Sequence, residues 1–289
     1  AVETIDGLRI VKAYKPEAGF PIIRFFSRWL ALNFAMRKVD ADVYYQRGAA
    51  AETGQVGLWC RYQRKKFVFG LASEMDCAAK SFLMTNFRER YLYLLGLKLA
   101  DSVIAQTKQQ QDLLELNHSK TSHILRNSGA MEEVSDSWPN RENREILWIG
   151  RISPEKRFEW LLDLAERCGY LKFVVVGAGN YQTDYERELL ERADSLDNVQ
   201  LIGRVAYSEI SLYYKRCFML CSTSPYEGFP NVYLEAWQMG IPVLAAYDPD
   251  GVIAARGLGW ICSSVEEMAS VLSDIEEDAG PWEQASKKT

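Results

Sequence analysis

The stretch from Cys217 to Val243 reads C-F-M-L-C-S-T-S-P-Y-E-G-F-P-N-V-Y-L-E-A-W-Q-M-G-I-P-V. It begins with a short apolar run, continues through a segment rich in Ser, Pro and Gly, and resumes with helical spacing that Gly240 closes. The lengths and the punctuating residues predict a buried strand, a loop, a helix over 230–239 and the next strand. Such a unit is typical of a parallel α/β sheet.

Two acidic residues, Glu227 and Glu235, lie on either side of the predicted helix start. Pro230 suits the first helical position, because the N–H that proline lacks would have had no partner there, and the amides that follow attract anions. A carboxylate accepts hydrogen bonds from two neighbouring hydroxyls, so one acid suits the diol of a ribose and the other a sugar. The arrangement suits a sugar-nucleotide site, although spacing alone favours two solvated surface charges.

Length and composition indicate a globular protein. The chain has 289 residues, 48% of them hydrophobic and 25% charged, which is enough for two domains of ordinary size. The apolar runs are too short to span a bilayer and the first residues lack a signal-peptide pattern, so we expect a cytoplasmic protein. Six scattered cysteines without a C-x-x-C pair predict free thiols, and two histidines without a Cys/His cluster predict no zinc site.

Charge is unevenly distributed along the chain. Residues 1–133 carry 19 Lys and Arg against 14 Asp and Glu, whereas residues 134–289 carry 15 against 25. A basic first half favours an anionic partner, such as a lipid headgroup, a phosphorylated acceptor or a membrane surface, although uneven solvated charge explains it as well. Residues 22–38 predict an aromatic- and Arg-containing helix, for which packing in a core is favoured over lying on a membrane.

Short apolar runs alternate with helical segments twice along the chain, on either side of a polar, proline-containing segment. The predicted strands are 7–13, 42–46, 67–71, 102–105 and 123–125, followed by 145–149, 171–176, 199–202, 218–221, 242–246 and 259–262. We therefore expect two parallel α/β domains, 1–133 and 145–289, joined by a linker over 134–144. Ligands bind at the carboxyl ends of such strands, which predicts that Arg151, Gly177, Arg204 and Glu227 converge on one edge.

The segment G-R-I-S-P-E-K-R, from Gly150 to Arg157, places Arg151 and Lys156 across a strand-to-helix turn. The two cations could close on a diphosphate from two sides, although Arg and Lys in such turns are usually solvated. The string V-V-V-G-A-G-N-Y-Q, over 174–182, invites a dinucleotide-binding interpretation. Gln182 stands where that fingerprint needs its third glycine, which argues against a dehydrogenase.

Taken together, these motifs resemble those of one enzyme family. E-G-F-P-N-V-Y-L-E-A, with its E-x7-E frame at Glu227 and Glu235, and the G-R-x-x-x-x-K pattern resemble the retaining group 1 glycosyltransferases of the GT-B fold. The segments 42–47, 100–114 and 124–128 resemble the acceptor-side domain of the same family. The resemblance implies an α/β protein of two doubly wound Rossmann-like domains facing a cleft, of which the first is incomplete and the second binds the nucleotide sugar.

The resemblance also implies roles for site residues. Arg151 and Lys156 would stabilise the departing nucleoside diphosphate, Glu227 would contact the donor sugar, and Glu235 would contact the ribose. Gly150 opens the donor motif, and Arg204 lies in the segment I-G-R-V that resembles the part contacting the nucleobase. Further donor contacts, mainly through the backbone, are implied for Gly228, Phe229, Pro230, Asn231 and Val232.

Two departures from the family pattern stand out. Many members have a His after the strand that corresponds to 67–71, whereas this chain has Ala72-Ser73-Glu74, so Glu74 or Ser73 substitutes or the role is missing. The chain also begins without Met, enters the family pattern at the second strand and stops before the usual closing helices, which predicts a fragment.

We therefore expect a retaining hexosyltransferase that moves a sugar from a nucleotide donor, a UDP-sugar in the favoured case, to a hydroxyl of a glycan, glycolipid or lipid-linked acceptor. No cofactor, metal or nucleic acid is expected, although Asp40-Ala41-Asp42 and Asp248-Pro249-Asp250 match the metal-binding D-x-D pattern of another glycosyltransferase fold; turn chemistry explains both. The product would enter polysaccharide or glycolipid biosynthesis, with peripheral membrane contact as an option. A sugar-nucleotide epimerase and a non-catalytic nucleotide-sugar-binding protein are the alternatives.

Overall fold

The computed structural model describes residues 2–5, 7–13, 21–78, 86–129, 145–177 and 183–289. Their contacts divide the chain into two compact units. Unit 1 comprises Ala1–Ala105 and Gln110–Leu125, and unit 2 comprises Gln106–Gln109 and Arg126–Thr289. The linker predicted over 134–144 lies outside the described residues.

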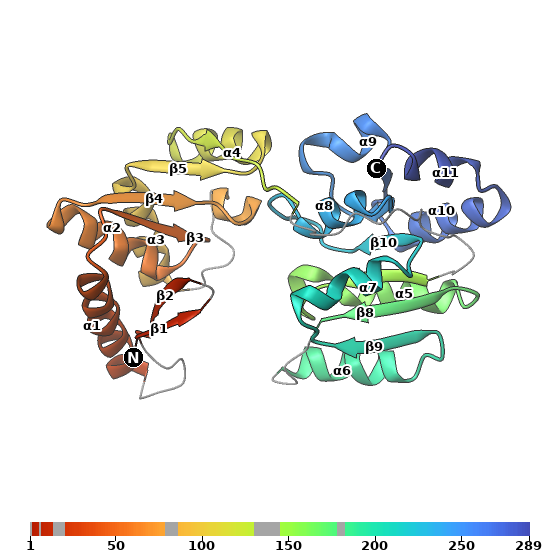
Figure 1. The fold of residues 1–289 in the computed structure, drawn as a ribbon, viewed down its shortest axis with the longest axis horizontal. Helices are drawn as coiled ribbons and strands as arrows, with labels where there is room; N and C mark the ends of the chain where they lie inside the picture. The colour runs from red at the N-terminus through yellow and green to blue at the C-terminus, as the bar shows by residue number, and fades with distance from the viewer. Residues whose placement is uncertain (1, 6, 14–20, 79–85, 130–144, 178–182) are drawn as a thin grey trace. The chain divides into compact units, whose positions relative to one another are not determined.

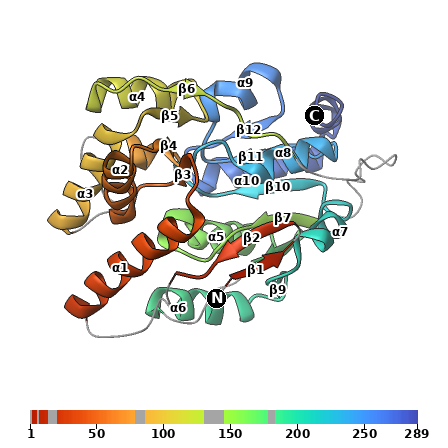
Figure 2. The same ribbon diagram turned by 60° about the vertical axis from the view of Figure 1, so that its left-hand side comes forward.

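Unit 1 contains a four-stranded parallel sheet in the order β3-β4-β5-β6. The strands are β3 (Val43–Arg47), β4 (Lys66–Gly70), β5 (Ser102–Ala105) and β6 (His123–Ile124). Figure 1 labels the first three, and Figure 2 also labels β6. The connecting elements are α2 (Ala51–Gln63), the 3-10 turn η1 (Glu74–Cys77), α3 (Phe87–Leu99) and α4 (Lys108–His118). Because sheet order follows chain order, the described strands of this sheet are wound in one direction, whereas a doubly wound sheet was expected here too.

One face of the unit 1 sheet is buried. Phe67 and Phe69, two positions apart on β4, have no exposed surface and pack in one cluster with side chains of α2, α3 and α4. Helices α2 and α3 cross closely, because a Cβ added to Gly54 would lie 2.3 Å from the carbonyl oxygen of Leu92. Glycine is therefore required where the two helices meet.

A hairpin and a long helix precede this sheet. β1 (Val2–Ile5) and β2 (Leu8–Val11) pair antiparallel, with Gly7 at φ 78° between them, and α1 follows as Pro21–Val39. The predictions of a strand within 7–13 and a helix over 22–38 are confirmed, but the expectation that this strand joins a parallel β-α unit is wrong, because a tight turn folds it back onto β1. Figure 2 shows the hairpin and α1 in red to orange. The two are linked by a hydrogen bond, in which the Arg9 guanidinium donates to the Lys38 carbonyl at 3.1 Å.

Unit 2 contains a six-stranded parallel sheet in the order β12-β11-β10-β7-β8-β9. The strands are β7 (Glu145–Ile149), β8 (Lys172–Val176), β9 (Val199–Gly203), β10 (Met219–Ser222), β11 (Val243–Ala245) and β12 (Gly259–Ile261). The helices are α5 (Phe158–Arg167), α6 (Asp184–Asp194), α7 (Ile210–Tyr214), α8 (Asn231–Gln238), α9 (Val252–Arg256), α10 (Val265–Glu277) and α11 (Gly280–Ser286), with 3-10 turns η3 (Pro154–Lys156), η4 (Tyr207–Glu209) and η5 (Pro249–Gly251). The winding reverses between β7 and β10, which confirms the predicted doubly wound sheet.

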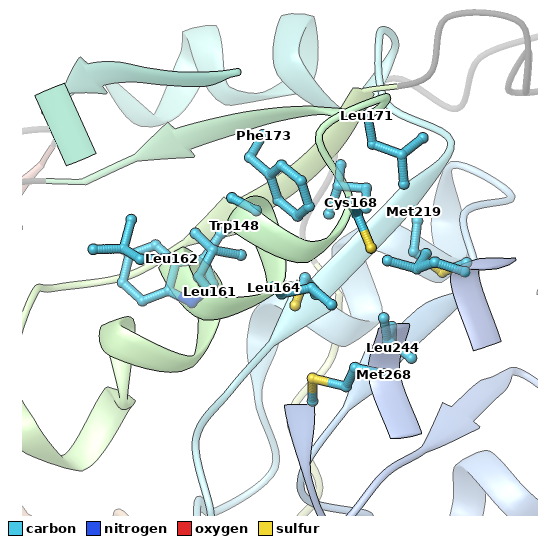
Figure 3. Close-up of a cluster of buried hydrophobic side chains, with 14 of the residues drawn as sticks. Trp148, Leu161, Leu162, Leu164, Cys168, Leu171, Phe173, Met219, Leu244 and Met268 are labelled. Atoms are coloured by element: carbon cyan, nitrogen blue, oxygen red, sulfur yellow. The ribbon is translucent and has the colours of Figure 1, made fainter. Parts of the chain in front are cut away.

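Both faces of the unit 2 sheet are covered, because buried side chains alternate along its strands. Trp148 and Phe173 lie in a cluster with α5, α6 and α10, part of which Figure 3 shows. Leu147 and Val174, one position away on the same strands, lie in a second cluster with Tyr214 and the apolar side of α8. The near-continuous apolar strands in the sequence follow from this two-sided burial.

Two further expectations concern the whole chain. All six cysteines are free and buried, as predicted. In the described part of the chain, no helix has the length and apolarity that a bilayer crossing requires.

Candidate functional site

Four strand ends carry the predicted site residues of unit 2. Arg151 follows β7, Gly177 follows β8, Arg204 follows β9 and Glu227 follows β10. All four strands are parallel, so these residues lie at one edge of the sheet. Strands β7 and β10 are the neighbours between which the winding reverses, and ligands bind outside the carboxyl ends of the strands at such a point. The structure thus brings the predicted residues to the edge where a ligand is expected.

Two glycines let the strand ends approach closely. The N–H of Gly150 donates to the Val176 carbonyl at 3.1 Å, and the N–H of Gly177 donates to the Gly203 carbonyl at 2.8 Å. Gly177 has φ +144°, and a Cβ there would lie 1.8 Å from the carbonyl oxygen of Gly150. A side chain at position 177 would therefore push the ends of β7 and β8 apart.

Glu227 forms an ion pair with Lys156, between Oε1 and Nζ, and both side chains are largely buried. The Lys156 backbone is held in turn, since its carbonyl accepts a hydrogen bond from Thr223 Oγ1 at 2.5 Å. Thr223 itself accepts from Trp148 Nε1 at 3.1 Å. The β7 strand and the loop after β10 thus position the lysine, and the site holds a cation and an anion that neutralise one another.

Arg151 lies at the rim of the site, with 68% of its side chain exposed. Its guanidinium donates to Glu155 at 2.7 Å, four residues further along the chain. Burial alone would raise the pKa of Glu155, but hydrogen bonds from its own amide, Arg151 and Ser153 outweigh burial and lower that pKa. The guanidinium is therefore tethered to an ionised carboxylate while it faces solvent.

Glu235 is buried, with 5% of its surface exposed. Its Oε2 accepts a hydrogen bond from the Tyr214 hydroxyl at 2.9 Å, and its Oε1 accepts one from the Tyr207 hydroxyl at 3.2 Å. Burial, together with the adjacent carboxylate, raises the pKa of Tyr214 well above its ordinary value, so this phenol remains a donor. The alternative in which Glu235 is a solvated helix charge is therefore wrong.

The loop before α8 is held by two residues that the sequence analysis did not select, Gln106 and Asn127. Gln106 Oε1 accepts from the Phe229 N–H at 3.1 Å, and Gln106 Nε2 donates to Asn127 Oδ1 at 3.0 Å. Asn127 Nδ2 donates to the Phe229 carbonyl at 2.9 Å and to Asn231 Oδ1 at 2.8 Å. Both residues belong to unit 2 by their contacts, although they lie in segments that resemble the acceptor-side domain. Several glutamines after β5 and a single asparagine after β6 were the available signal.

Helix α8 begins at Asn231, one residue later than predicted. Pro230 precedes it with φ −65° and ψ 124°, so the placement of Pro230 at the first helical position is wrong because its ψ is extended. Among the described residues, the N–H groups of Asn231 and Val232 have no hydrogen-bond partner, as expected at a helix start. Gly240, at φ 72°, closes the helix as predicted. Two backbone donors are thus available beside the loop of Gly228 and Phe229.

The remaining candidates have structural partners. The Asp248 carboxylate accepts from the amides of Ile253 and Ala254, and that of Asp250 accepts from the amides of Lys108 and Gln109. Asp40 and Asp42 both pair with Lys65. Within the described ranges, no group of three or more His, Cys, Asp or Glu could hold a metal ion.

The loop after β4, where the resemblance implies a His, lies in unit 1. There Ser73 caps η1 by accepting a hydrogen bond from the Met75 N–H at 3.0 Å. The Asp76 carboxylate is buried and accepts from the amides of Ala49, Ala72 and Ser73. Burial raises the pKa of Asp76, although these hydrogen bonds oppose the shift. Asp76 therefore ties the loops after β3 and β4 together.

Residues 143–278 match the model of a family described as glycosyl transferases group 1. Over 190 residues the chain is 28% identical to the amylovoran biosynthesis glycosyltransferase AmsD of Erwinia amylovora, covering 62% of this chain and 52% of the relative. Over 137 residues it is 35% identical to the alpha-monoglucosyldiacylglycerol synthase of Streptococcus pneumoniae, covering 45% and 30%. These matches support the group 1 glycosyltransferase family for this chain. The chain spans about half the length of the first curated relatives that it matches.

Solved structures identify the fold. Sucrose-phosphate synthase from Thermosynechococcus elongatus superposes with a TM-score of 0.76 at 16% identity, covering 99% of this chain and 79% of that one. A variant of S. aureus TarM in complex with Fondaparinux, alpha-GlcNAc-glycerol and UDP gives 0.72 at 16%, covering 90% and 54%. The UDP-GlcNAc 2-epimerase from Neisseria meningitidis bound to UDP-GlcNAc gives 0.61 at 16%, covering 94% and 78%. The chain has the GT-B fold of two Rossmann-like units, as predicted.

Proposed function

We propose that this protein is a retaining glycosyltransferase that moves a sugar from a nucleotide donor, a UDP-sugar in the favoured case, to an acceptor hydroxyl. The observation that carries the proposal is Glu235, a buried carboxylate beside the reversal of strand order whose two oxygens both accept hydroxyl hydrogen bonds. A buried carboxylate needs such donors, and the diol of a ribose supplies two on one ligand. The nucleotide would thus bind through its ribose at α8.

The cationic side of the site suits the leaving diphosphate. In the proposed reaction the bond between the anomeric carbon and the diphosphate oxygen breaks, the acceptor oxygen bonds to the same face of the sugar, and its proton passes to the diphosphate. Arg151, Lys156 and the two amides at the start of α8 would stabilise the charge that develops on the diphosphate. On donor binding Lys156 would exchange Glu227 for phosphate, which leaves the Glu227 carboxylate to accept from a sugar hydroxyl.

Two rival functions would use the same residues. A sugar-nucleotide epimerase would convert the donor without an acceptor, and the GT-B fold is shared with a 2-epimerase. A binding protein would hold the donor without turnover. The family model and the names of the two relatives described above favour transfer.

Nucleotide binding is the first test. Calorimetric titration of UDP, GDP and NAD into the chain should show binding of UDP or GDP, weakened at least about tenfold in Glu235→Ala and Arg151→Ala, because each change removes a charge-assisted contact. Glu188→Ala, which removes an exposed acid on α6, is the matched control and should bind as the wild type does. Binding of neither UDP nor GDP by a chain that is folded by circular dichroism would refute the proposal.

Turnover then separates the three functions. Release of free nucleoside diphosphate that depends on an added glycan or glycolipid acceptor indicates transfer, and retention is read from the anomeric proton of the product by NMR. Isomerisation of the UDP-sugar without an acceptor would instead identify an epimerase. Donor binding with neither reaction would identify a binding protein.

We also propose a cytoplasmic setting, since the buried free cysteines suit a reducing compartment.

We further propose that the acceptor is lipid-linked and that α1 contacts the membrane that holds it. Phe26, Leu30 and Phe34 recur every four residues and are 62%, 67% and 70% exposed, with Arg37 and Lys38 exposed at the end of the same helix. Aromatic and basic side chains on one helix suit an anionic lipid surface. Cosedimentation with phosphatidylglycerol vesicles should be lost when all three apolar residues become Ser and kept in Leu116→Ser, which removes an exposed leucine of α4. Equal binding by both variants would refute the contact.

A further inference from the structure

Two tyrosines hold Glu235, and they differ in how firmly they are fixed. Tyr214 has no exposed surface, and its hydroxyl also lies 3.3 Å from the Val232 carbonyl oxygen. Tyr207 is 57% exposed, although its hydroxyl reaches the buried carboxylate. One hydroxyl is therefore enclosed in the core of unit 2, whereas the other extends inward from a ring that faces solvent.

The backbone around Tyr207 is also less enclosed than the backbone around Tyr214. Tyr207 begins η4 in the segment after β9, where residues 206–209 are all exposed. That turn is closed by a long hydrogen bond of 3.4 Å from the Ala206 N–H to Glu209 Oε2 and by one of 3.0 Å from the Glu209 N–H to the Ala206 carbonyl. Tyr214 lies at the end of α7, inside a buried cluster. Tyr207 thus lies in a more exposed segment than Tyr214.

The two hydroxyls use different oxygens of the carboxylate. Tyr214 donates to Oε2 and Tyr207 to Oε1. A ribose diol has to reach the same carboxylate, and it approaches from solvent, where Tyr207 lies and Tyr214 does not. A phenol hydroxyl and a ribose hydroxyl are alike as donors to a carboxylate, so one can replace the other without leaving Glu235 unsatisfied.

We propose that the Tyr207 hydroxyl occupies, in the unliganded site, the place that a ribose hydroxyl of the nucleotide takes on Glu235, and that nucleotide binding displaces it. This inference rests on the proposed function of the site. The buried Glu235 carboxylate thereby stays hydrogen-bonded in the unliganded site. A nucleoside diphosphate has to displace the Tyr207 hydrogen bond before it can bind there, and this lowers its affinity. Weaker binding of that product favours its release.

The test compares Tyr207→Phe with the wild type, using whichever of UDP and GDP the wild type binds. Removing the competing hydroxyl should tighten binding about fivefold, the worth of one hydrogen bond, and slow dissociation in stopped-flow measurements. The 2′,3′-dideoxy form of the same nucleotide has no hydroxyl to compete for Glu235, so its affinity should not change. Phenylalanine keeps the size of the ring, which protects the fold.

Tyr214→Phe is the matched control, because it removes the other hydroxyl from the same carboxylate. It should weaken binding of the normal nucleotide, since Glu235 then loses the partner that fixes it. Equal weakening of both nucleotides in Tyr207→Phe would mean that the Tyr207 hydroxyl contacts the ligand away from the ribose hydroxyls. Unchanged affinity for both would mean that no displacement occurs. Either result overturns the inference while the proposed function stands. A wild type that binds neither UDP nor GDP overturns both.

Discussion

The two parallel sheets in the described part of the chain are built from the same β-α unit, yet they differ in winding. In unit 2 the strand order reverses between β7 and β10, and both faces carry buried clusters. In unit 1 the four strands follow chain order, and one buried cluster covers them. Loops on either side of a reversal diverge and leave room for a ligand between strand ends. The difference explains why the candidate donor residues gather in unit 2, although both units end their strands in polar loops.

The largest loss of stability is expected from a substitution at Gly177, where the ends of β7 and β8 approach closely. In Gly177→Val the new Cβ would overlap the Gly150 carbonyl oxygen at 1.8 Å, and valine resists a φ of +144°. We expect a loss of more than about 4 kcal/mol in the free energy of unfolding of unit 2, with loss of nucleotide binding. Denaturant unfolding monitored by circular dichroism and calorimetry would measure both.

Gly169→Ala is the control for that substitution. Gly169 also lies in unit 2, but a Cβ there would meet nothing within 4 Å. Its stability should match that of the wild type within about 0.5 kcal/mol. A Gly177 variant as stable as this control would contradict the role assigned to the close approach.

A further prediction concerns whether the two units unfold independently. It compares the truncation of one buried phenylalanine in each unit. Phe67 of unit 1 and Phe173 of unit 2 both have no exposed surface. Phe→Ala at either position should destabilise its own unit by about 3–5 kcal/mol. Only Phe173→Ala should weaken nucleotide binding, as measured by calorimetry below the melting temperature. Equal loss of binding in both variants would mean that the units unfold together.

A smaller effect is expected for Asn127→Ala, which removes the donors to the Phe229 carbonyl and Asn231 Oδ1. We expect a loss of about 1–2 kcal/mol in unfolding free energy and a weakening of nucleotide binding by about threefold to tenfold. Asn198→Ala is matched to it, because Asn198 Nδ2 donates to the Ala165 and Leu171 carbonyls away from the site. That control should lose similar stability but keep its affinity, and equal affinity in the two variants would contradict the positioning role of Asn127.

The smallest predicted effect is the contribution of His118, in unit 1, to the pH dependence of stability. Burial lowers the pKa of His118, hydrogen bonds to the carbonyls of Ala78 and Cys77 oppose the shift, and Arg90 adds to it. Protonation therefore favours the unfolded chain, in which the pKa is about 6.5, so stability is kept above that pH and falls as the pH drops toward the lower folded value. Melting curves between about pH 7.5 and 5 should show this fall in the wild type, and it should be weaker in His118→Gln. His123→Gln, at an exposed position, should leave the fall unchanged.

Local patterns in the sequence predicted most of the secondary structure. The helix expected over 230–239 runs from Asn231 to Gln238, and Gly240 ends it, because turn residues and apolar spacing act within a few positions. The β1 strand and the short helices α9 and α11 were not expected, since segments of four to seven residues carry too few apolar positions to show a period. The two glutamates were found through their spacing along the chain.

The partners of those glutamates could not be found in this way. Tyr207 and Tyr214 are 28 and 21 residues from Glu235, and Gln106 is 123 residues from Phe229. Such pairs depend on which strands are neighbours and on which face each helix packs, and several strand orders satisfy the same alternation of polar and apolar residues.

The amino-acid sequence therefore specified which segments become strands and helices and which residue types follow the strand ends, because propensity, periodicity and glycine positions are local properties. The tertiary structure decided that β7 and β10 are neighbours, that Glu235 is buried and not solvated, and that Lys156 meets Glu227. These outcomes are set by burying both faces of one sheet at once, a condition that applies only when distant parts of the chain pack together.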